Sequence, residues 1–274
     1  MRSFSREYNY FEMCGRFLLA FSIAATLQAQ QDPADLLLRV RARIDESLNR
    51  LPNYMCTQTI DRYRYQPNVP DHSVACDESS ERPSTHLNTS DRLRFEVAVK
   101  STGEMYGWPG ENRFDDRELV DIVTDGAIST GTFTAFLTGI FANDAATFTY
   151  DGETTQDGRT FSEFGFHVPY EKSHYFIGFA THRAVTGYDG TFLVNPKTAD
   201  LARLSIRTSQ LPAESGACYS STTLDYARIH LQGIEFLLPS LSVLRIFSRD
   251  GSMAENHILY SNCHEFLGES ESSA

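Results

Sequence analysis

The chain has 274 residues, with 24 Lys and Arg against 36 Asp and Glu, and a formal net charge of -12. Apolar residues make up 41% and aromatic residues 12%, a globular composition that excludes disordered and collagen-like chains. The acidic excess argues against a nucleic acid or an anionic lipid surface as a ligand, because both are bound through Lys and Arg. The length fits one large domain or two small ones.

The N-terminus carries the pattern of an export signal. Arg2, Arg6 and Arg16 precede an apolar run over residues 17–27. This run is too short to cross the hydrocarbon layer of about 30 Å, whereas its length is typical of a signal-peptide core. Residues 1–29 are therefore predicted to be a signal peptide.

Two details of this leader stay open. Either Met1 or Met13 is the true start, and cleavage is expected near Ala29, a small residue suited to signal peptidase. The alternative is an N-terminal anchor that is never cleaved. We expect a periplasmic or secreted protein with no transmembrane span after cleavage.

Four cysteines follow the predicted leader: Cys56, Cys76, Cys218 and Cys263. An even number of cysteines in an exported protein predicts two disulfides. Three connectivities are open, and the pairing of neighbours in sequence, Cys56 with Cys76 and Cys218 with Cys263, is favoured. Because no Cys-x-x-Cys motif is present, a zinc site or a thioredoxin-like centre is not expected.

An amphipathic helix is predicted directly after the leader. Asp32 is a suitable N-cap and Pro33 suits the first helical position. Apolar residues then recur at helical spacing, and Pro52 ends a helix of about 18 residues; the apolar residues are Leu37, Val40, Ile44, Leu48 and Leu51.

The rest of the chain is dominated by strand patterns. Before residue 124 we predict strands over 54–65 and 93–99, a hairpin partner over 104–108, a long loop over 66–90 and a short helix over 116–123. After it, five Asp-Gly pairs predict turns, at Asp125, Asp151, Asp157, Asp189 and Asp250. Strand patterns lie between them, over 146–150, 159–168, 174–179, 182–187, 191–195, 201–208, 219–230, 233–238, 242–248 and 255–267.

These elements predict a mainly β protein of the α+β class. Short strands joined by hairpin turns are typical of an antiparallel sheet, here of roughly ten strands. We expect one domain over residues 30–267, followed by a disordered tail over 268–274.

A second helix is predicted over about 131–142. Its apolar residues form one stripe: Phe133, Phe136, Leu137, Ile140 and Phe141. The opposite side has Thr134, Thr138 and Gly139 and no charge. Either both sides of this helix are covered, or its back faces something only mildly polar.

Motifs of known chemistry are missing from the sequence. His167, Glu171, His174 and His182 form the best catalytic or metal-binding candidate, but histidines on strand faces are usually solvated or bound by one hydrogen bond. Cys263 precedes His264, and neighbours in a strand point to opposite faces, so a disulfide is the better interpretation than a catalytic thiol. We expect no enzyme activity, no cofactor and no metal.

One further cluster is acidic: Asp115, Asp116, Asp121 and Asp125. A solvated helix start explains it better than a cation site.

Four stretches together suggest a family. They are Leu-Arg-Phe-Glu-Val-Ala-Val at 93–99, the Gly-opened segment 190–204 with Asn195-Pro196, Leu-Asp-Tyr at 224–226, and Gly-Ile-Glu-Phe-Leu-Leu-Pro at 233–239. In this order they resemble the LolA/LolB-type periplasmic lipoprotein carriers and sorting proteins and the N-terminal domain of the RseB envelope sensors. The chain is also similar to uncharacterised exported proteins of acidobacteria.

The resemblance covers roughly residues 90–260 and implies an antiparallel half-barrel around a helix, with an apolar cavity for acyl chains. The cysteines and the 66–90 loop are not part of the carrier pattern. Candidate ligand contacts are the five residues of the apolar stripe, Phe133, Phe136, Leu137, Ile140 and Phe141, together with Trp108.

The sequence thus predicts an exported, non-catalytic protein that binds an apolar ligand, such as an acyl chain or a lipidated molecule, or a protein partner. A lipid or a lipoprotein fits as partner, and a nucleic acid does not. The first alternative is a structural or sensing envelope module with a filled core. The second is a hydrolase-like enzyme that uses residues near His167 to His182.

Overall fold

The computed structural model describes residues 32–69, 74, 76, 83–100, 103–110, 114, 119–179, 182–208 and 211–265. The predicted signal peptide over 1–29 and the predicted tail over 268–274 lie outside these residues. So do Asp115 and Asp116 of the acidic cluster.

Helix α1 spans Pro33–Arg50, as predicted. Asp32 caps it, because its Oδ1 accepts a hydrogen bond of 3.0 Å from the backbone N–H of Ala34. The buried stripe runs through Leu36, Val40 and Ile44, so it begins one residue earlier than predicted. In the part of the chain that the structure describes, no helix combines the length and the apolar character needed to cross a membrane.

One open antiparallel sheet of ten strands dominates the protein, in the order β3-β2-β1-β12-β11-β10-β9-β8-β5-β4. A separate pair, β6 and β7, forms a small second sheet. The strands are β1 Tyr54–Pro67, β2 Thr85–Lys100, β3 Gly103–Gly107, β4 Thr147–Gln156, β5 Arg159–Val168, β6 Phe176–Phe179, β7 His182–Val185, β8 Tyr188–Val194, β9 Leu201–Thr208, β10 Ala217–Leu231, β11 Ile234–Ser248 and β12 Met253–Glu265. The mainly β, half-barrel prediction is confirmed.

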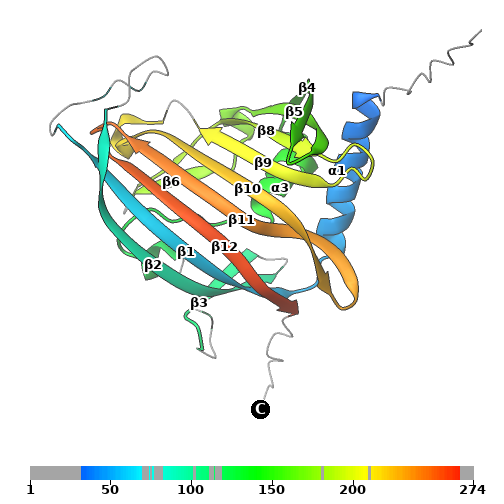
Figure 1. Cartoon of the computed structure of the whole chain (residues 1–274), viewed down its shortest axis with the longest axis horizontal. Helices are drawn as coiled ribbons and strands as arrows, with labels where there is room; N and C mark the ends of the chain where they lie inside the picture. The colour runs from blue at the N-terminus through cyan, green and yellow to red at the C-terminus, as the bar shows by residue number, and fades with distance from the viewer. Residues whose placement is uncertain are drawn as a thin grey trace, which may run out of the picture. The chain divides into compact units, whose positions relative to one another are not determined.

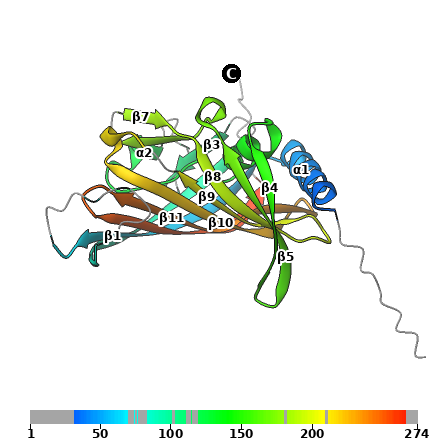
Figure 2. The same cartoon turned by 90° about the horizontal axis from the view of Figure 1, so that it is seen from above.

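The helices cover one face of this sheet. Figure 2 shows α1, α2 (Leu119–Ile122) and β7 on the same side of the floor formed by β1, β10 and β11. Figure 1 shows α1 beside the end of the sheet at which β10 turns into β11. Two short 3-10 helices, Tyr170–Lys172 and Ala213–Ser215, belong to the connections.

The Phe-rich segment is helical, but shorter and less regular than predicted. Helix α3 spans only Ala135–Leu137 and continues as a π-helical turn over Thr138–Ala142. All five stripe residues are buried, at 7% exposure or less. Arg41 of α1 donates a hydrogen bond of 3.1 Å to the carbonyl of Phe141, which fixes the turn against the helix.

Several predicted boundaries are wrong for reasons of pairing. The loop over 66–90 is shorter, because β1 runs to Pro67 and β2 begins at Thr85, where Pro67 and Thr85 pair. The stretches 233–238 and 242–248 form one strand, β11. Pro239 stays inside this strand because the pairing of β10 with β11 changes register at this point, between Asp225 and Tyr226 of β10.

Only some of the Asp-Gly pairs are hairpin turns. Asp157-Gly158 joins β4 to β5, with φ values of 49° and 73°. Asp189-Gly190 lies inside β8 instead, where a Cβ on Gly190 would stand 2.0 Å from the carbonyl oxygen of Ser205. Asp151-Gly152 likewise falls within β4, at a register shift. Glycine serves close packing or a bulge at these two positions.

Two large apolar clusters pack on the covered face of the sheet. The first, here named the phenylalanine cluster, comprises Leu36, Val40, Ile44, Phe136, Leu137, Ile140, Phe141, Ala145, Phe164, Phe166, Val168, Tyr188, Phe192, Val194, Ala199, Leu201, Leu204, Ile206 and Leu224. The second, the tyrosine cluster, comprises Tyr54, Cys56, Ile60, Phe95, Val97, Val99, Tyr106, Leu119, Phe133, Leu231, Phe236, Leu238, Ile258 and Tyr260.

The four cysteines form two disulfides, but not the pairs that are neighbours in sequence. Cys56 is bonded to Cys263 and Cys76 to Cys218, across sequence separations of 207 and 142 residues. The reason is the strand order: β1 pairs with β12, and Met55 lies opposite His264. Sequence distance does not indicate which strands become neighbours in the sheet.

Candidate functional site

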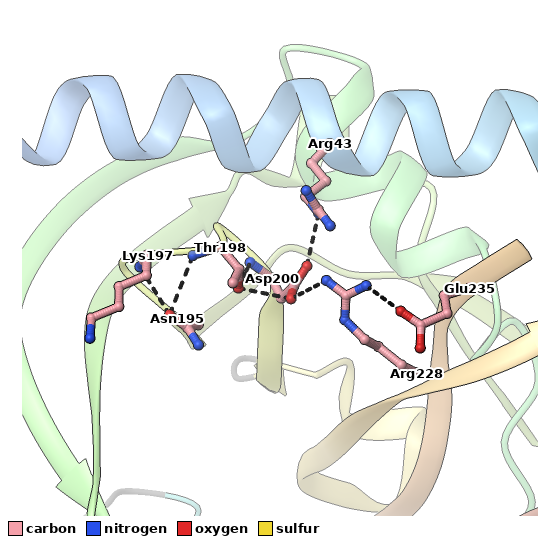
Figure 3. A network of polar contacts seen from close by, with 7 residues as sticks. All are labelled: Arg43, Asn195, Lys197, Thr198, Asp200, Arg228 and Glu235. Atoms are coloured by element: carbon pink, nitrogen blue, oxygen red, sulfur yellow. Dashed lines mark hydrogen bonds and ion pairs between the residues drawn. The ribbon is translucent and has the colours of Figure 1, made fainter.

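A pocket of about 230 Å³ opens between the C-terminal half of α1 and the end of the sheet. Figure 3 shows how α1 passes over the rim formed by β9, β10 and β11. The lining residues are Arg43, Ile44, Glu46, Ser47, Arg50, Leu137, Ala199, Asp200, Leu201, Arg228, Ile234, Glu235, Phe236 and Leu237.

The floor of the pocket is apolar and draws on both clusters. Ile44, Leu137 and Leu201 belong to the phenylalanine cluster, and Phe236 belongs to the tyrosine cluster. The pocket therefore marks the place where two separately packed cores meet at the sheet end.

The rim is charged and organised around Asp200 (Figure 3). Its carboxylate accepts from Arg43 of α1 at 2.8 Å and from Arg228 of β10 at 2.6 Å. Arg228 also bonds Glu235 of β11 at 2.9 Å. Asp200 thus ties the helix to two strands, and it is only 17% exposed.

A tight turn between β8 and β9 places Asp200. Asn195 Oδ1 accepts from the backbone N–H of Lys197 at 2.9 Å, and the N–H of Ala199 returns to the carbonyl of Asn195 at 2.8 Å. Thr198 Oγ1 donates to the Asp200 carboxylate at 2.8 Å. The Asn195-Pro196 turn signal in the sequence is the local cause of this geometry.

The charges at the rim are balanced. Burial alone would raise the pKa of Asp200, but hydrogen bonds from Arg228 and Thr198 and the charges of Arg43 and Arg228 outweigh it and lower that pKa. Arg50 is bonded to Glu46 on the same helix at 2.8 Å. Each arginine at the mouth thus has a carboxylate partner, so the mouth has little net charge.

The residues predicted to contact a ligand do not form one site. Leu137 lines the pocket, while Phe136, Ile140 and Phe141 lie in the phenylalanine cluster. Phe133 lies in the tyrosine cluster. Whether any of them contacts a ligand stays a prediction.

Trp108 lies apart from this segment. It follows β3, is 39% exposed, and its ring lies 4.7 Å from that of Phe95.

Sequence reasoning missed the charged rim. The helical repeat singles out only the apolar residues of α1 and leaves Arg43 and Arg50 without a role, and Arg228 belongs to no motif. A usable signal was present in two of the stretches that suggested the family. Residues 224–226 and 233–239 lie on either side of Arg228, and the second stretch contains Glu235.

The histidine candidate is dispersed. His167 Nδ1 lies 2.5 Å from Asp189 Oδ1, and both side chains are more than half exposed. His174 and Glu171 are exposed in the connection after β5. The side chain of His182 lies outside the described residues, and among the described ones no three metal-binding side chains come together.

A buried carboxylate anchors the segment that crosses the tyrosine cluster. Glu104 of β3 accepts from the Tyr106 hydroxyl at 2.5 Å and from the backbone N–H groups of Gly131 and Phe133 at 2.7 and 3.0 Å. Burial raises the pKa of Glu104, and these three hydrogen bonds counteract the rise only in part.

Two more polar bonds hold the same segment to β12. Asn256 donates to the carbonyl of Ala127 at 2.8 Å, and the Tyr260 hydroxyl donates to Thr132 at 2.9 Å. Residues 127–133, here named the strap, are therefore fixed to both β3 and β12.

No protein-family model and no curated protein matches the sequence. Among solved structures, the chain is similar to a DUF1329 family protein from Desulfovibrio piger, with 12% identity and a TM-score of 0.43 over 88% of this chain and 96% of that one. It is similar to a putative outer membrane lipoprotein-sorting protein domain from Vibrio parahaemolyticus, with 10% identity and a TM-score of 0.40 over 86% and 93% of the two chains.

A LolA superfamily protein from Nitrosomonas europaea matches with 12% identity and a TM-score of 0.35 over 87% of this chain and 97% of that one.

Proposed function

We propose that the protein is an exported, non-catalytic binding protein, and that the pocket beside α1 takes part of an acyl chain from a lipid or a lipidated protein. The observation that carries this proposal is the apolar floor of Ile44, Leu137, Leu201 and Phe236 beneath a charged rim. Such a site buries a chain and leaves its polar end at the mouth.

The size of the pocket limits what it holds. Its volume of about 230 Å³ is below the roughly 300–1,000 Å³ typical of small-molecule sites. A segment of a chain fits better than a complete lipid. The positive charges of the arginines in the lining are balanced by the negative charges of the carboxylates. The polar head group of a ligand can therefore replace one partner of an ion pair at the rim.

The exported location is supported by the two disulfides, which persist in oxidising compartments. The predicted leader over residues 1–29 is consistent with it.

One observation favours a structural or sensing module as the second candidate. The five residues of the Phe-rich segment are all buried against other side chains. If no acyl chain enters the pocket, the protein with its filled core has a structural role only.

The decisive experiment is titration of the purified mature protein with a fluorescent fatty acid. Ser47→Trp places a large ring on the pocket wall, while Asn49→Trp places the same ring on the exposed side of the same helix as a control. We expect the wild type and Asn49→Trp to bind and Ser47→Trp to bind much more weakly. Absence of binding by the wild type contradicts the carrier function and favours the structural module.

Native mass spectrometry adds an independent test. Protein purified from the envelope should carry a lipid-sized mass that Ser47→Trp lacks.

A further inference from the structure

Several side chains in the sheet present buried polar atoms with no hydrogen-bond partner among the described residues, and three of these side chains lie around Tyr260. In these three the unpaired groups are the hydroxyls of Tyr54 and Tyr226 and both amide atoms of Gln58. Tyr54 and Gln58 are 0% exposed. Buried polar groups in native proteins are nearly always paired, so each exception calls for an explanation, such as a water, an ion or a functional role.

One of these residues, Tyr226, lies close along β10 to a residue that lines the pocket. Tyr226 and Arg228 are two residues apart on β10, so they project from the same face of the sheet, about 7 Å apart along the strand. Arg228 lines the mouth of the pocket. The Tyr226 hydroxyl therefore lies one step further along the same face.

Tyr54 and Tyr226 belong to one group of hydroxyls. Burial raises the pKa of Tyr54, and the nearby Glu104, Tyr226 and Tyr260 raise it further. Gln58 lies directly opposite Tyr260 in the pairing of β1 with β12. The Tyr260 hydroxyl already has a partner, because it donates to Thr132 of the strap. The unpaired groups therefore lie around a tyrosine that is itself hydrogen-bonded.

We infer that Tyr226, Tyr54 and Gln58 form a polar subsite behind the pocket, which recognises a hydroxyl, ester or amide group on the bound chain. This inference rests on the proposed function and specifies the class of chain. The amide of Gln58 and the two hydroxyls together offer both donors and acceptors, which suits groups of this kind.

The surroundings favour an uncharged group. An anion would face the carboxylate of Glu104, which is among the neighbours of Tyr54. A cation would meet a carboxylate, Glu104, that already accepts three hydrogen bonds. A neutral polar group meets neither obstacle.

The test compares dodecanoic acid with 3-hydroxy- and 12-hydroxydodecanoic acid, measured by displacement of the fluorescent fatty acid. One hydrogen bond gained should strengthen binding about fivefold. We expect the wild type to prefer at least one hydroxylated chain by this factor or more. Tyr226→Phe and Gln58→Leu should lose the preference and still bind dodecanoic acid.

Tyr188→Phe is the matched control, because it removes one hydroxyl from a buried tyrosine of the phenylalanine cluster and should keep the preference. If Gln58→Leu fails to fold, Tyr226→Phe, which removes a single oxygen atom, decides the test alone.

Three outcomes overturn the inference. Equal affinity of the wild type for all three acids leaves the proposed function standing and means that water is the only partner of these groups. A preference that survives in Tyr226→Phe places recognition elsewhere. Absence of binding by all three acids removes both the subsite and the proposed function.

Discussion

The phenylalanine cluster and the tyrosine cluster lie on the same face of one sheet, but they are built by different means. In the first, Phe192 is fully buried and its ring contacts those of Phe141, Phe148, Phe164 and Phe166 at centroid distances of 5.1 to 6.3 Å. Aromatic packing of this kind stabilises by apolar burial and ring geometry.

The tyrosine cluster combines apolar burial with polar and covalent bonds. Glu104 and Tyr260 hold the strap, and the Cys56–Cys263 disulfide joins β1 to β12. In the same region the hydroxyl of Tyr54 and the amide of Gln58 have no partner among the described residues. The difference teaches that one part of the core is held by ring packing, whereas the other adds polar and covalent bonds to apolar burial.

The largest expected effect is the loss of Phe192. Phe192→Ala removes the ring at the centre of the phenylalanine cluster and should lower the free energy of unfolding by about 3–5 kcal/mol. Urea denaturation measures it. Phe161→Ala on the same sheet, where Phe161 is only half-buried, is the control and should lose clearly less. Equal losses would mean that the phenylalanine cluster is not tightly packed.

The disulfides are next in size. Replacing Cys76 and Cys218 together by Ser should cost about 2–4 kcal/mol, because a long loop in the unfolded chain is released. Replacing Cys56 and Cys263 together by Ser should lower the free energy of unfolding by a similar amount. In hydrogen exchange, the amides of β1 and β12 should then lose protection before those of β8 and β9. Uniform loss of protection in all four strands would contradict a separate stability of the two regions.

Tyr106→Phe should cost about 1.5–3 kcal/mol at pH 7, because Glu104 loses a charge-assisted hydrogen bond. This loss of stability also depends on pH. The folded-state pKa of Glu104 lies above its ordinary value of 4.5. Between the two values the folded protein binds more protons than the unfolded chain, so stability falls as pH rises.

Without the Tyr106 hydroxyl, the pKa of Glu104 rises further. The deficit of Tyr106→Phe should therefore shrink between pH 7 and pH 5, whereas that of Phe192→Ala should not change. Chemical denaturation at both pH values checks this, and a deficit of Tyr106→Phe that is independent of pH would show that Glu104 is not its cause.

The smallest expected effect separates paired from partnerless hydroxyls. Tyr260→Phe loses its bond to Thr132 and should cost about 1 kcal/mol. Tyr226→Phe loses no bond among the described residues and should change stability by less than about 0.5 kcal/mol, or increase it. A larger loss in Tyr226→Phe than in Tyr260→Phe would reveal a bond that its hydroxyl makes in solution.

Local patterns predicted the elements well because their causes are local. The Asp32-Pro33 start and the helical repeat predicted α1, and the strand pattern over 201–208 predicted β9 with its bounds. The Asp189-Gly190 pair misled because the same glycine that suits a turn also suits the close approach of Ser205 and Phe166.

The site was beyond local patterns. Arg43, Asp200 and Arg228 come from α1, the turn before β9 and the end of β10, and only the sheet order brings them together. The disulfide pairs depend on the same order. A resemblance to known proteins could indicate the half-barrel but not the partners of these side chains.

The central pairing of β1 with β12 also governs how the chain reaches this structure. The first strand of the sheet and the last are neighbours, and their cysteines are separated by 207 residues. Contacts of such long range are slow to form. Until β12 is made, one edge of β1 has no partner and can pair with another chain. A truncation or a stalled ribosome shortly before residue 253 should therefore yield aggregation rather than a smaller folded protein.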